Sequence, residues 1–178
     1  AKGIAGFTNG EAFRVGNPAP TIYLARAYIR RSFNMGGEEE YFGENANQVN
    51  KVRTKKYFDV VLGKFSIADF FDNNKFSHDP RSQFFNWSLM SAGGWDYPAN
   101  VRGYTVGAMF ELGTPKFKAR LAAVMVPTEA NGNTMDKKIG QARSHTLEIE
   151  KPITLFKQRG TIRLLGFYTI SHMGNYDA

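Results

Sequence analysis

The sequence contains no cysteine and only three histidines among its 178 residues. Without cysteine the chain has no disulfide, no thiolate metal ligand and no thiol nucleophile, which suits an oxidising compartment but also many cytosolic proteins. The three histidines, His78, His145 and His172, are scattered and have no spacing typical of a metal site. We expect each of them to be a surface or interface residue, and we predict no metal or cofactor.

Long apolar runs are also absent. No stretch approaches the roughly 18 apolar residues that a membrane-spanning helix needs, and the mean hydropathy is −0.39. A helical membrane protein is therefore excluded, whereas a membrane β-barrel is not, because its strands alternate apolar and polar residues. The first residues, AKGIAGFTNG, lack the apolar segment of a signal peptide. We expect that a leader was removed or that the true start lies elsewhere.

Acidic residues are fewer than basic residues. The chain has 23 Lys and Arg against 16 Asp and Glu, a net charge of +7. Nucleic-acid binders concentrate their basic residues in one patch or arm, but here they are dispersed, with Arg30-Arg31 and Lys55-Lys56 the closest to clusters. Nucleic acid is therefore not an expected partner. An acidic surface or an anion-attracting pore remains compatible with the charge.

Alternating apolar and polar residues are the main structural signal in the chain. In Gly103–Leu112, for example, Tyr104, Val106 and Ala108 alternate with Thr105 and Gly107. A period of two predicts strands with one apolar face and one polar face. Six strands are predicted, with a short seventh as an alternative among the first 20 residues: 23–33, 51–64, 103–112, 117–126, 145–156 and 161–170.

The predicted connections differ in length. Gly113–Lys116 and 157–160 are short turns, whereas 34–50 and 127–140 are long polar loops. Short turns at one end and long loops at the other are typical of outer-membrane barrels, and a β-sandwich does not need that asymmetry. Pro152 falls inside a predicted strand and indicates an edge, a bulge or the end of that strand.

One stretch, residues 66–101, reads as an insert between strands. Asp79-Pro80 is a favourable helix start and Gly93-Gly94 a stop. Between them Phe84, Trp87 and Met90 recur at helical spacing, which predicts a short helix with one apolar face. A weaker signal, Ser66 followed by Asp69, resembles a capping arrangement and predicts a helical turn through Ala68 to Phe71.

Three segments of this region, GKFSIADFFDNN, SHDPRSQFFNWSLM and GGWDYPANVRGYTVG, resemble the bacterial carbohydrate-selective outer-membrane porins of the OprB type. AGFTNGEAFRVG, YLARAYIRRSF and the run from His145 to Gly166 agree with that family in order. The resemblance implies an all-β protein, an antiparallel transmembrane β-barrel that lets sugars diffuse across the outer membrane. Its implied partners are small carbohydrates, outer-membrane lipid and lipopolysaccharide.

Six or seven strands are too few for such a pore. The smallest transmembrane barrels have about 8 strands and sugar-conducting pores about 16 or more. We therefore expect residues 1–178 to be a single segment of one barrel domain, with strands missing on both sides and with the insert folded toward the lumen. A homo-oligomer or an envelope complex is a possible assembly.

A sugar-selective pore needs aromatic rings to stack on pyranose faces and planar polar groups to bind hydroxyls. The insert offers both kinds of group, and arginines on the inward strand faces are expected to set a transverse field against its acids. Trp95 and Asp96 are the strongest candidates, while Arg81 and Arg102 are alternatively expected to pair with insert aspartates. The candidate pore-lining residues are Arg26, Arg30, Asp69, Asp72, Arg81, Trp95, Asp96, Arg102 and Arg120.

An enzyme is not expected. Two of the insert aspartates have the residue type that a glycoside hydrolase requires, but a carboxylate beside an arginine in a wet loop stays ionised and is a poor general acid. Two further alternatives stay open. One is a barrel that acts as an accessory or scaffold in an envelope complex, and the other is a soluble β-sandwich that binds sugar through the insert.

Overall fold

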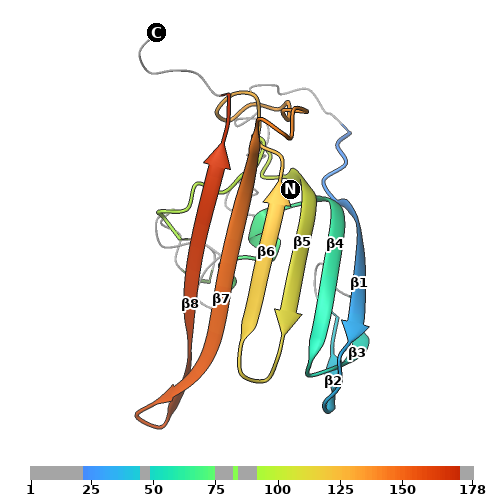
Figure 1. The fold of residues 1–178 in the computed structure, drawn as a ribbon, viewed down its shortest axis with the longest axis vertical. Helices are drawn as coiled ribbons and strands as arrows, with labels where there is room; N and C mark the ends of the chain where they lie inside the picture. The colour runs from blue at the N-terminus through green and yellow to red at the C-terminus, as the bar shows by residue number, and fades with distance from the viewer. Residues whose placement is uncertain (1–21, 45–48, 75–81, 84–91, 173–178) are drawn as a thin grey trace.

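The computed structural model describes residues 22–44, 49–74, 82–83 and 92–172. Six strands form one antiparallel sheet in the order β1-β4-β5-β6-β7-β8 (Figure 1). A separate antiparallel hairpin is formed by β2 and β3. The strands are β1 (Ala27–Asn34), β2 (Glu39–Phe42), β3 (Lys51–Thr54), β4 (Tyr57–Phe65), β5 (Thr105–Gly113), β6 (Lys118–Val124), β7 (Arg143–Leu155) and β8 (Gln158–Ile170).

All six predicted strands are present, but several bounds need correction. The first strand begins at Ala27 rather than at residue 23. The predicted turn 157–160 is wrong in part, because residues 158–160 belong to β8. The predicted strand 51–64 is divided at Lys55-Lys56 into β3 and β4. The predicted loop 34–50 is wrong in part, because it contains β2. In β2 the residue Glu40 is paired across the hairpin with Arg53, and opposite charges facing each other across two strands are favourable. The pattern within β2 alone is too short to reveal this.

The strand register gives the sheet two different faces. On the face that we call inner, neighbouring strands align the charged residues Asp59, Glu111, Arg120 and Glu148. On the face that we call outer, they align the apolar residues Val60, Phe110, Leu121 and Leu147. The predicted alternation is confirmed, since a strand sends successive side chains to opposite faces.

The outer face is mostly apolar and exposed, and it also carries the exposed Arg31 of β1, which is aligned with Val60. Ile29 on β1 is 76% exposed, Leu62 on β4 is 52% exposed and Leu164 on β8 is 68% exposed. Phe58 stacks on Phe110 across two strands of this face, with ring centroids 6.2 Å apart. No second layer of the described residues covers these side chains.

The core lies on the opposite side of the sheet. It joins inner-face residues of β4, β5 and β6 to residues of the insert, and all of them are almost fully buried. Its members are Val61, Phe65, Ile67, Phe71, Trp95, Met109, Ala122 and Val124. The described part of the insert therefore packs on the inner face.

The described part of the insert contains a short 3-10 helix, Ile67–Asp69. The amides of Phe70 and Phe71 both donate to the carbonyl of Ile67 at 3.1 Å, so the predicted helical turn is confirmed. The predicted cap is wrong, because Ser66 makes no side-chain capping hydrogen bond. The predicted helix after Asp79 falls mostly on residues 79–81 and 84–91, which lie outside the described residues.

The connections follow the predicted asymmetry only in part. The β5–β6 and β7–β8 turns lie at one end of the sheet, and the β4–β5 and β6–β7 connections lie at the other (Figure 1). The predicted long loop 34–50 departs from this pattern, because the β1–β4 connection, which contains the β2–β3 hairpin, lies at the end of the short turns (Figure 1). Pro152 lies in β7 beyond Glu150, the last residue paired with β6, so one side of the strand is an edge at this position. An edge was one of the three predicted explanations for this proline.

The sheet is open within the described residues. Its two edge strands, β1 and β8, are not paired with each other, and a closed barrel is not formed by this part of the chain. No described helix is long and apolar enough to cross a membrane.

Candidate functional site

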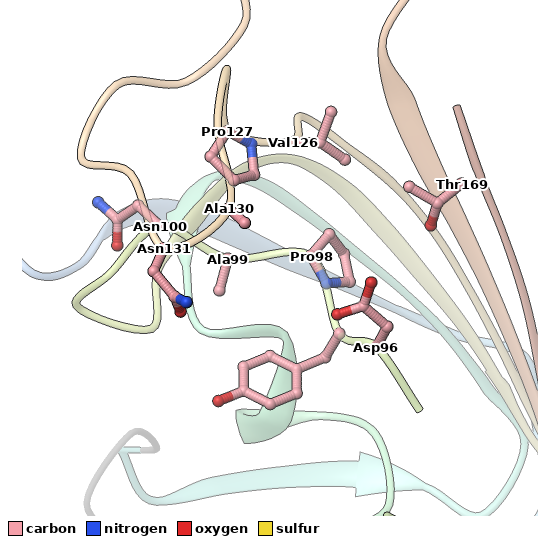
Figure 2. A pocket seen from close by; sticks show the side chains of 10 residues that line it. Asp96, Pro98, Ala99, Asn100, Val126, Pro127, Ala130, Asn131 and Thr169 are labelled. Carbon is pink, nitrogen blue, oxygen red and sulfur yellow. The ribbon is translucent and has the colours of Figure 1, made fainter. Parts of the chain in front are cut away.

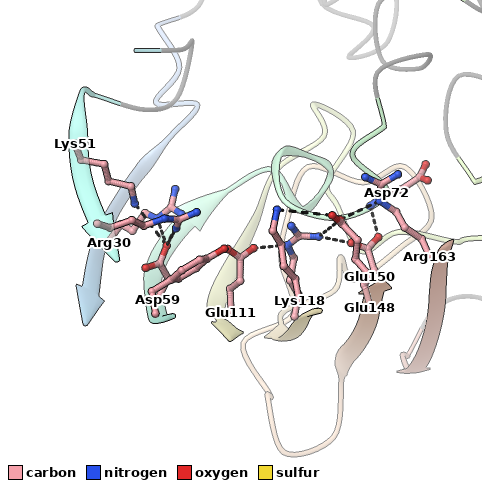
Figure 3. A network of polar contacts seen from close by, with 12 residues as sticks. Arg30, Lys51, Asp59, Asp72, Glu111, Lys118, Glu148, Glu150 and Arg163 are labelled. Carbon is pink, nitrogen blue, oxygen red and sulfur yellow. Dashed lines mark hydrogen bonds and ion pairs between the residues drawn. The ribbon is translucent and has the colours of Figure 1, made fainter. Parts of the chain in front are cut away.

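A network of charged side chains crosses the inner face of the sheet (Figure 3). Its centre is Arg120 on β6, which is only 8% exposed. The Arg120 guanidinium donates to Glu111 on β5 and Glu148 on β7 and, at 3.3 Å, to Glu150. Three carboxylates on two flanking strands therefore share one arginine, and each is buried.

The network continues on both sides of Arg120. On β4 the hydroxyl of Tyr57 donates to Glu111 at 2.6 Å. On the other side Glu150 accepts a hydrogen bond of 3.1 Å from Arg163 on β8, and the Lys118 ammonium lies 3.7 Å from the same carboxylate. The network thus spans β4 to β8, and its acids and bases are adjacent rather than on opposing walls.

A second group of charges lies where the β2–β3 hairpin meets β1 and β4. Arg30, Lys51 and Arg53 surround the fully buried carboxylate of Asp59. Burial lowers the pKa of Lys51, and the neighbouring Arg30 guanidinium lowers it further. Arg53 is buried where the hairpin meets the inner face.

Two nominated aspartates fix the insert to the sheet. Asp69 accepts two hydrogen bonds of 2.8 Å from Arg26, which precedes β1. Asp72 has a positive φ of 54°. Its backbone amide donates to Glu148 at 2.6 Å, and its carboxylate accepts from the amide of Ala92 at 2.6 Å. Both residues therefore hold the insert in place.

Trp95 packs within the core and is 5% exposed. Its ring lies 6.1 Å from that of Phe71 and 5.8 Å from that of Tyr97, measured between centroids. Arg102 places its guanidinium 4.4 Å from the ring centroid of Tyr23. Arg81 lies outside the described residues.

Asp96 borders a pocket of about 250 Å³ near the loop end of the sheet. One wall is the end of the insert and the other is the segment after β6, with Thr169 of β8 beside them (Figure 2). The amide of Val101 donates to the carbonyl of Gly132 at 3.0 Å and joins the two walls. The lining residues are Asp96, Tyr97, Pro98, Ala99, Asn100, Val126, Pro127, Ala130, Asn131 and Thr169.

The pocket combines an exposed carboxylate with an aromatic ring. No hydrogen bond or ion pair within the described part of the chain engages the Asp96 carboxylate, and Tyr97 is half-buried beside it. Asn100 is fully used in structure, since its Oδ1 accepts from the amides of Arg102 and Tyr104 and its Nδ2 donates to Tyr23. The wall is therefore held independently of any ligand.

The loop after β6 is tied to the end of β8. His172 Nδ1 lies 2.9 Å from Asp136 Oδ2, and the amide of Lys138 donates to the other carboxylate oxygen at 2.8 Å. The hydrogen bond from His172 holds the pKa of Asp136 below its usual value. This contact fixes the loop that supplies one wall of the pocket.

Sequence reasoning selected Arg30 and Arg120 but missed their buried partners. Asp59, Glu111 and Glu148 all occupy polar positions of alternating strands, and that alternation was the available signal. The alternation alone does not give the strand register, and the register is what brings these three residues into line.

Comparison of the chain with protein-family models, with curated proteins and with solved structures finds no match in any of the three.

Proposed function

We propose that this sheet is part of the wall of a bacterial outer-membrane β-barrel through which small carbohydrates diffuse. The observation that carries the proposal is the placement of apolar and charged residues. Large apolar side chains such as Ile29 and Leu164 are exposed on the outer face, while Arg120 and Glu148 are buried on the inner face. A barrel in lipid requires an apolar exterior and accepts a polar interior.

Strand length supports the same proposal for four of the six sheet strands, whereas β1 has 8 residues and β6 has 7. A transmembrane strand needs about 9–11 residues when it is tilted. Strands β4 and β5 have 9 residues each, and β7 and β8 have 13 residues each. The proposal includes further strands that pair with the edge strands β1 and β8. Without them, the backbone groups at these edges would have no hydrogen-bond partners in hydrocarbon. A barrel of about 16 strands is the size expected for a sugar pore.

The pocket supports sugar as the solute. The Asp96 carboxylate is available to accept hydrogen bonds from sugar hydroxyls, and the Tyr97 ring next to it offers an apolar surface to a pyranose. These groups agree with the carbohydrate preference that the sequence resemblance implies. Trp95, by contrast, supports the site through packing.

The bare outer face favours the barrel over a soluble β-sandwich, because a sandwich covers its apolar face with a second sheet. The insert packed on the inner face suits an open pore with a narrowed lumen, and it equally suits a plugged scaffold barrel. Conductance separates these two.

The test is single-channel conductance of the full chain, extracted from its membrane and placed in a planar bilayer, with D-glucose titrated as blocker. Stepwise conductance that D-glucose blocks saturably is the expected result. Asp96→Ala should weaken the block by about tenfold, the loss expected for one charged hydrogen bond. Glu129→Gln removes a carboxylate from the loop after β6, which forms the other wall, and Glu129 does not line the pocket, so this variant should leave the block unchanged.

A folded protein that never conducts would contradict the pore and favour the plugged scaffold barrel. A protein that is monomeric and soluble without detergent would contradict the barrel and favour the β-sandwich.

A further inference from the structure

The β2–β3 hairpin brings two cations to the inner face beside a third. Arg30 Nε lies 3.0 Å from Asp59 Oδ2, Arg53 Nη1 lies 3.2 Å from it and Lys51 Nζ lies 3.7 Å from it. All three cations therefore converge on one oxygen of one carboxylate. We call Arg30, Lys51 and Arg53 the cation cluster.

The cation cluster is not neutralised by the described residues. Glu40 lies opposite Arg53 in the β2–β3 register but forms no ion pair with it among the described residues. The three positive charges are ion-paired with the single negative charge of Asp59, which leaves a charge of +2 among these four groups. The next acid along the inner face, Glu111, is already bound by Tyr57 and Arg120. The rest of the network is balanced, because Lys118, Arg120 and Arg163 match three carboxylates: Glu111, Glu148 and Glu150.

Packing holds the cluster together despite the repulsion between like charges. The Arg53 guanidinium lies between two aromatic rings, 4.1 Å from the centroid of Phe42 and 3.4 Å from that of Tyr57. Arg53 is 6% exposed, and its Nε has no hydrogen-bond partner within the described chain. Lys51 Nζ is positioned by the hydroxyl of Ser32 at 3.2 Å. These packing contacts and the hydrogen bond to Ser32 therefore offset the electrostatic repulsion among the three cations.

Two members of the cluster remain reachable from solvent. The side chains of Arg30 and Lys51 are 22% and 20% exposed. Asp59 uses Nε and Nη2 of Arg30, which leaves Nη1 available to a ligand. A guanidinium and an ammonium side by side are the donors that bind phosphate and carboxylate groups.

We propose that the cation cluster is a binding site for an anionic group, phosphate or carboxylate, of a small solute. Arg30 and Lys51 donate hydrogen bonds to the anion, and the buried Arg53 supplies positive potential behind them. This site lies apart from the Asp96 pocket, and its function does not depend on sugar passage.

Equilibrium dialysis of the folded full chain in detergent, with inorganic phosphate as the probe at low ionic strength, tests the proposal. Wild-type protein should bind phosphate saturably, and Lys51→Gln and Arg30→Gln should each weaken binding by about tenfold or more. Lys118→Gln is the matched control, because it removes an inner-face lysine from the balanced part of the network. It should change binding by less than about twofold.

A variant that binds phosphate more tightly gives the decisive result, because damage to the fold does not increase the affinity for phosphate. Asp59→Asn removes the one internal counter-charge and should tighten phosphate binding by about tenfold, the reverse of losing a charged contact. The proposal is overturned by wild-type protein and Asp59→Asn that both fail to bind phosphate, or by equal losses in Lys51→Gln and Lys118→Gln. Because dialysis needs no conduction, a failed pore assay leaves this result intact.

Discussion

Arg120 is the residue on which the inner-face network depends. A buried arginine is tolerated because it contacts three carboxylates, Glu111, Glu148 and Glu150. Such a group does not make a large net contribution to stability, because the desolvation of each charge offsets most of the attraction. Removing one partner is different, because it leaves the remaining charges buried and unpaired.

We therefore predict that Arg120→Met destabilises the fold by about 3–5 kcal/mol, the cost of breaking a buried pair. Arg163→Met is the matched control. Arg163 is 26% exposed and contacts only Glu150 among the network acids, so its loss should cost about 1 kcal/mol or less. Urea unfolding of both variants in detergent measures the difference. Equal costs would show that Arg120 is no more important than a partly exposed ion pair.

Among the elements, the β7–β8 hairpin carries an unusual turn. Its two linking residues, Phe156 and Lys157, have φ values of 50° and 64°. Positive φ at both central residues is the type I′ conformation, which favours Asn-Gly. Phe156→Asn with Lys157→Gly should stabilise the protein by about 1 kcal/mol by relieving left-handed strain. Gln158→Gly, one residue inside β8, should give no gain, and a gain there would refute the turn explanation.

The loop between β6 and β7 depends on Asp136 and His172. Because this contact holds the pKa of Asp136 below its usual value of about 3.9, it stabilises the loop above that pH. The stabilisation is lost as pH falls through the lower folded-state pKa. Hydrogen exchange of the loop amides, corrected for intrinsic rates, should therefore rise below about pH 4. Asp136→Asn should abolish this step, and an unchanged profile in that variant would contradict the assignment.

The elements were largely predictable from the sequence, whereas their contacts were not. Alternation located the strands because each has a period of two, as in β5 and β8. The burial of Trp95 was not predictable, since it results from packing against Phe71 and Met109 rather than from local spacing. The same holds for Arg26 and Asp69, which lie 43 positions apart and meet only after the insert folds back.

At the scale of the whole molecule, the covered inner face and the exposed outer face of the sheet result from one arrangement. The insert and the β2–β3 hairpin both fold onto the inner face, where they cover charges and complete the core. This leaves apolar residues as the exterior of the sheet. In water that arrangement favours association through the exposed face, and in a bilayer it is the stable orientation.

Arginine substitutions at two depths of the proposed barrel wall provide the sharpest test of this arrangement. Leu121 and Leu155 both point to the outer face, and both are substantially exposed, at 46% and 59%. Leu121 lies in the middle of β6, whereas Leu155 ends β7 at the turn. Leu121→Arg should cost about 2–4 kcal/mol in folded stability, the cost of arginine near the bilayer midplane, and Leu155→Arg about 0–1 kcal/mol.

Reversible unfolding from lipid vesicles measures both costs on one scale. If the outer face met water, both leucines would already be solvated and either arginine would be tolerated to within about 0.5 kcal/mol. A cost that rises from the strand end to the strand centre follows from the hydrocarbon profile, because a charge near the interface reaches the headgroups. Equal costs at the two positions would exclude a lipid-facing sheet, whatever the inner face binds.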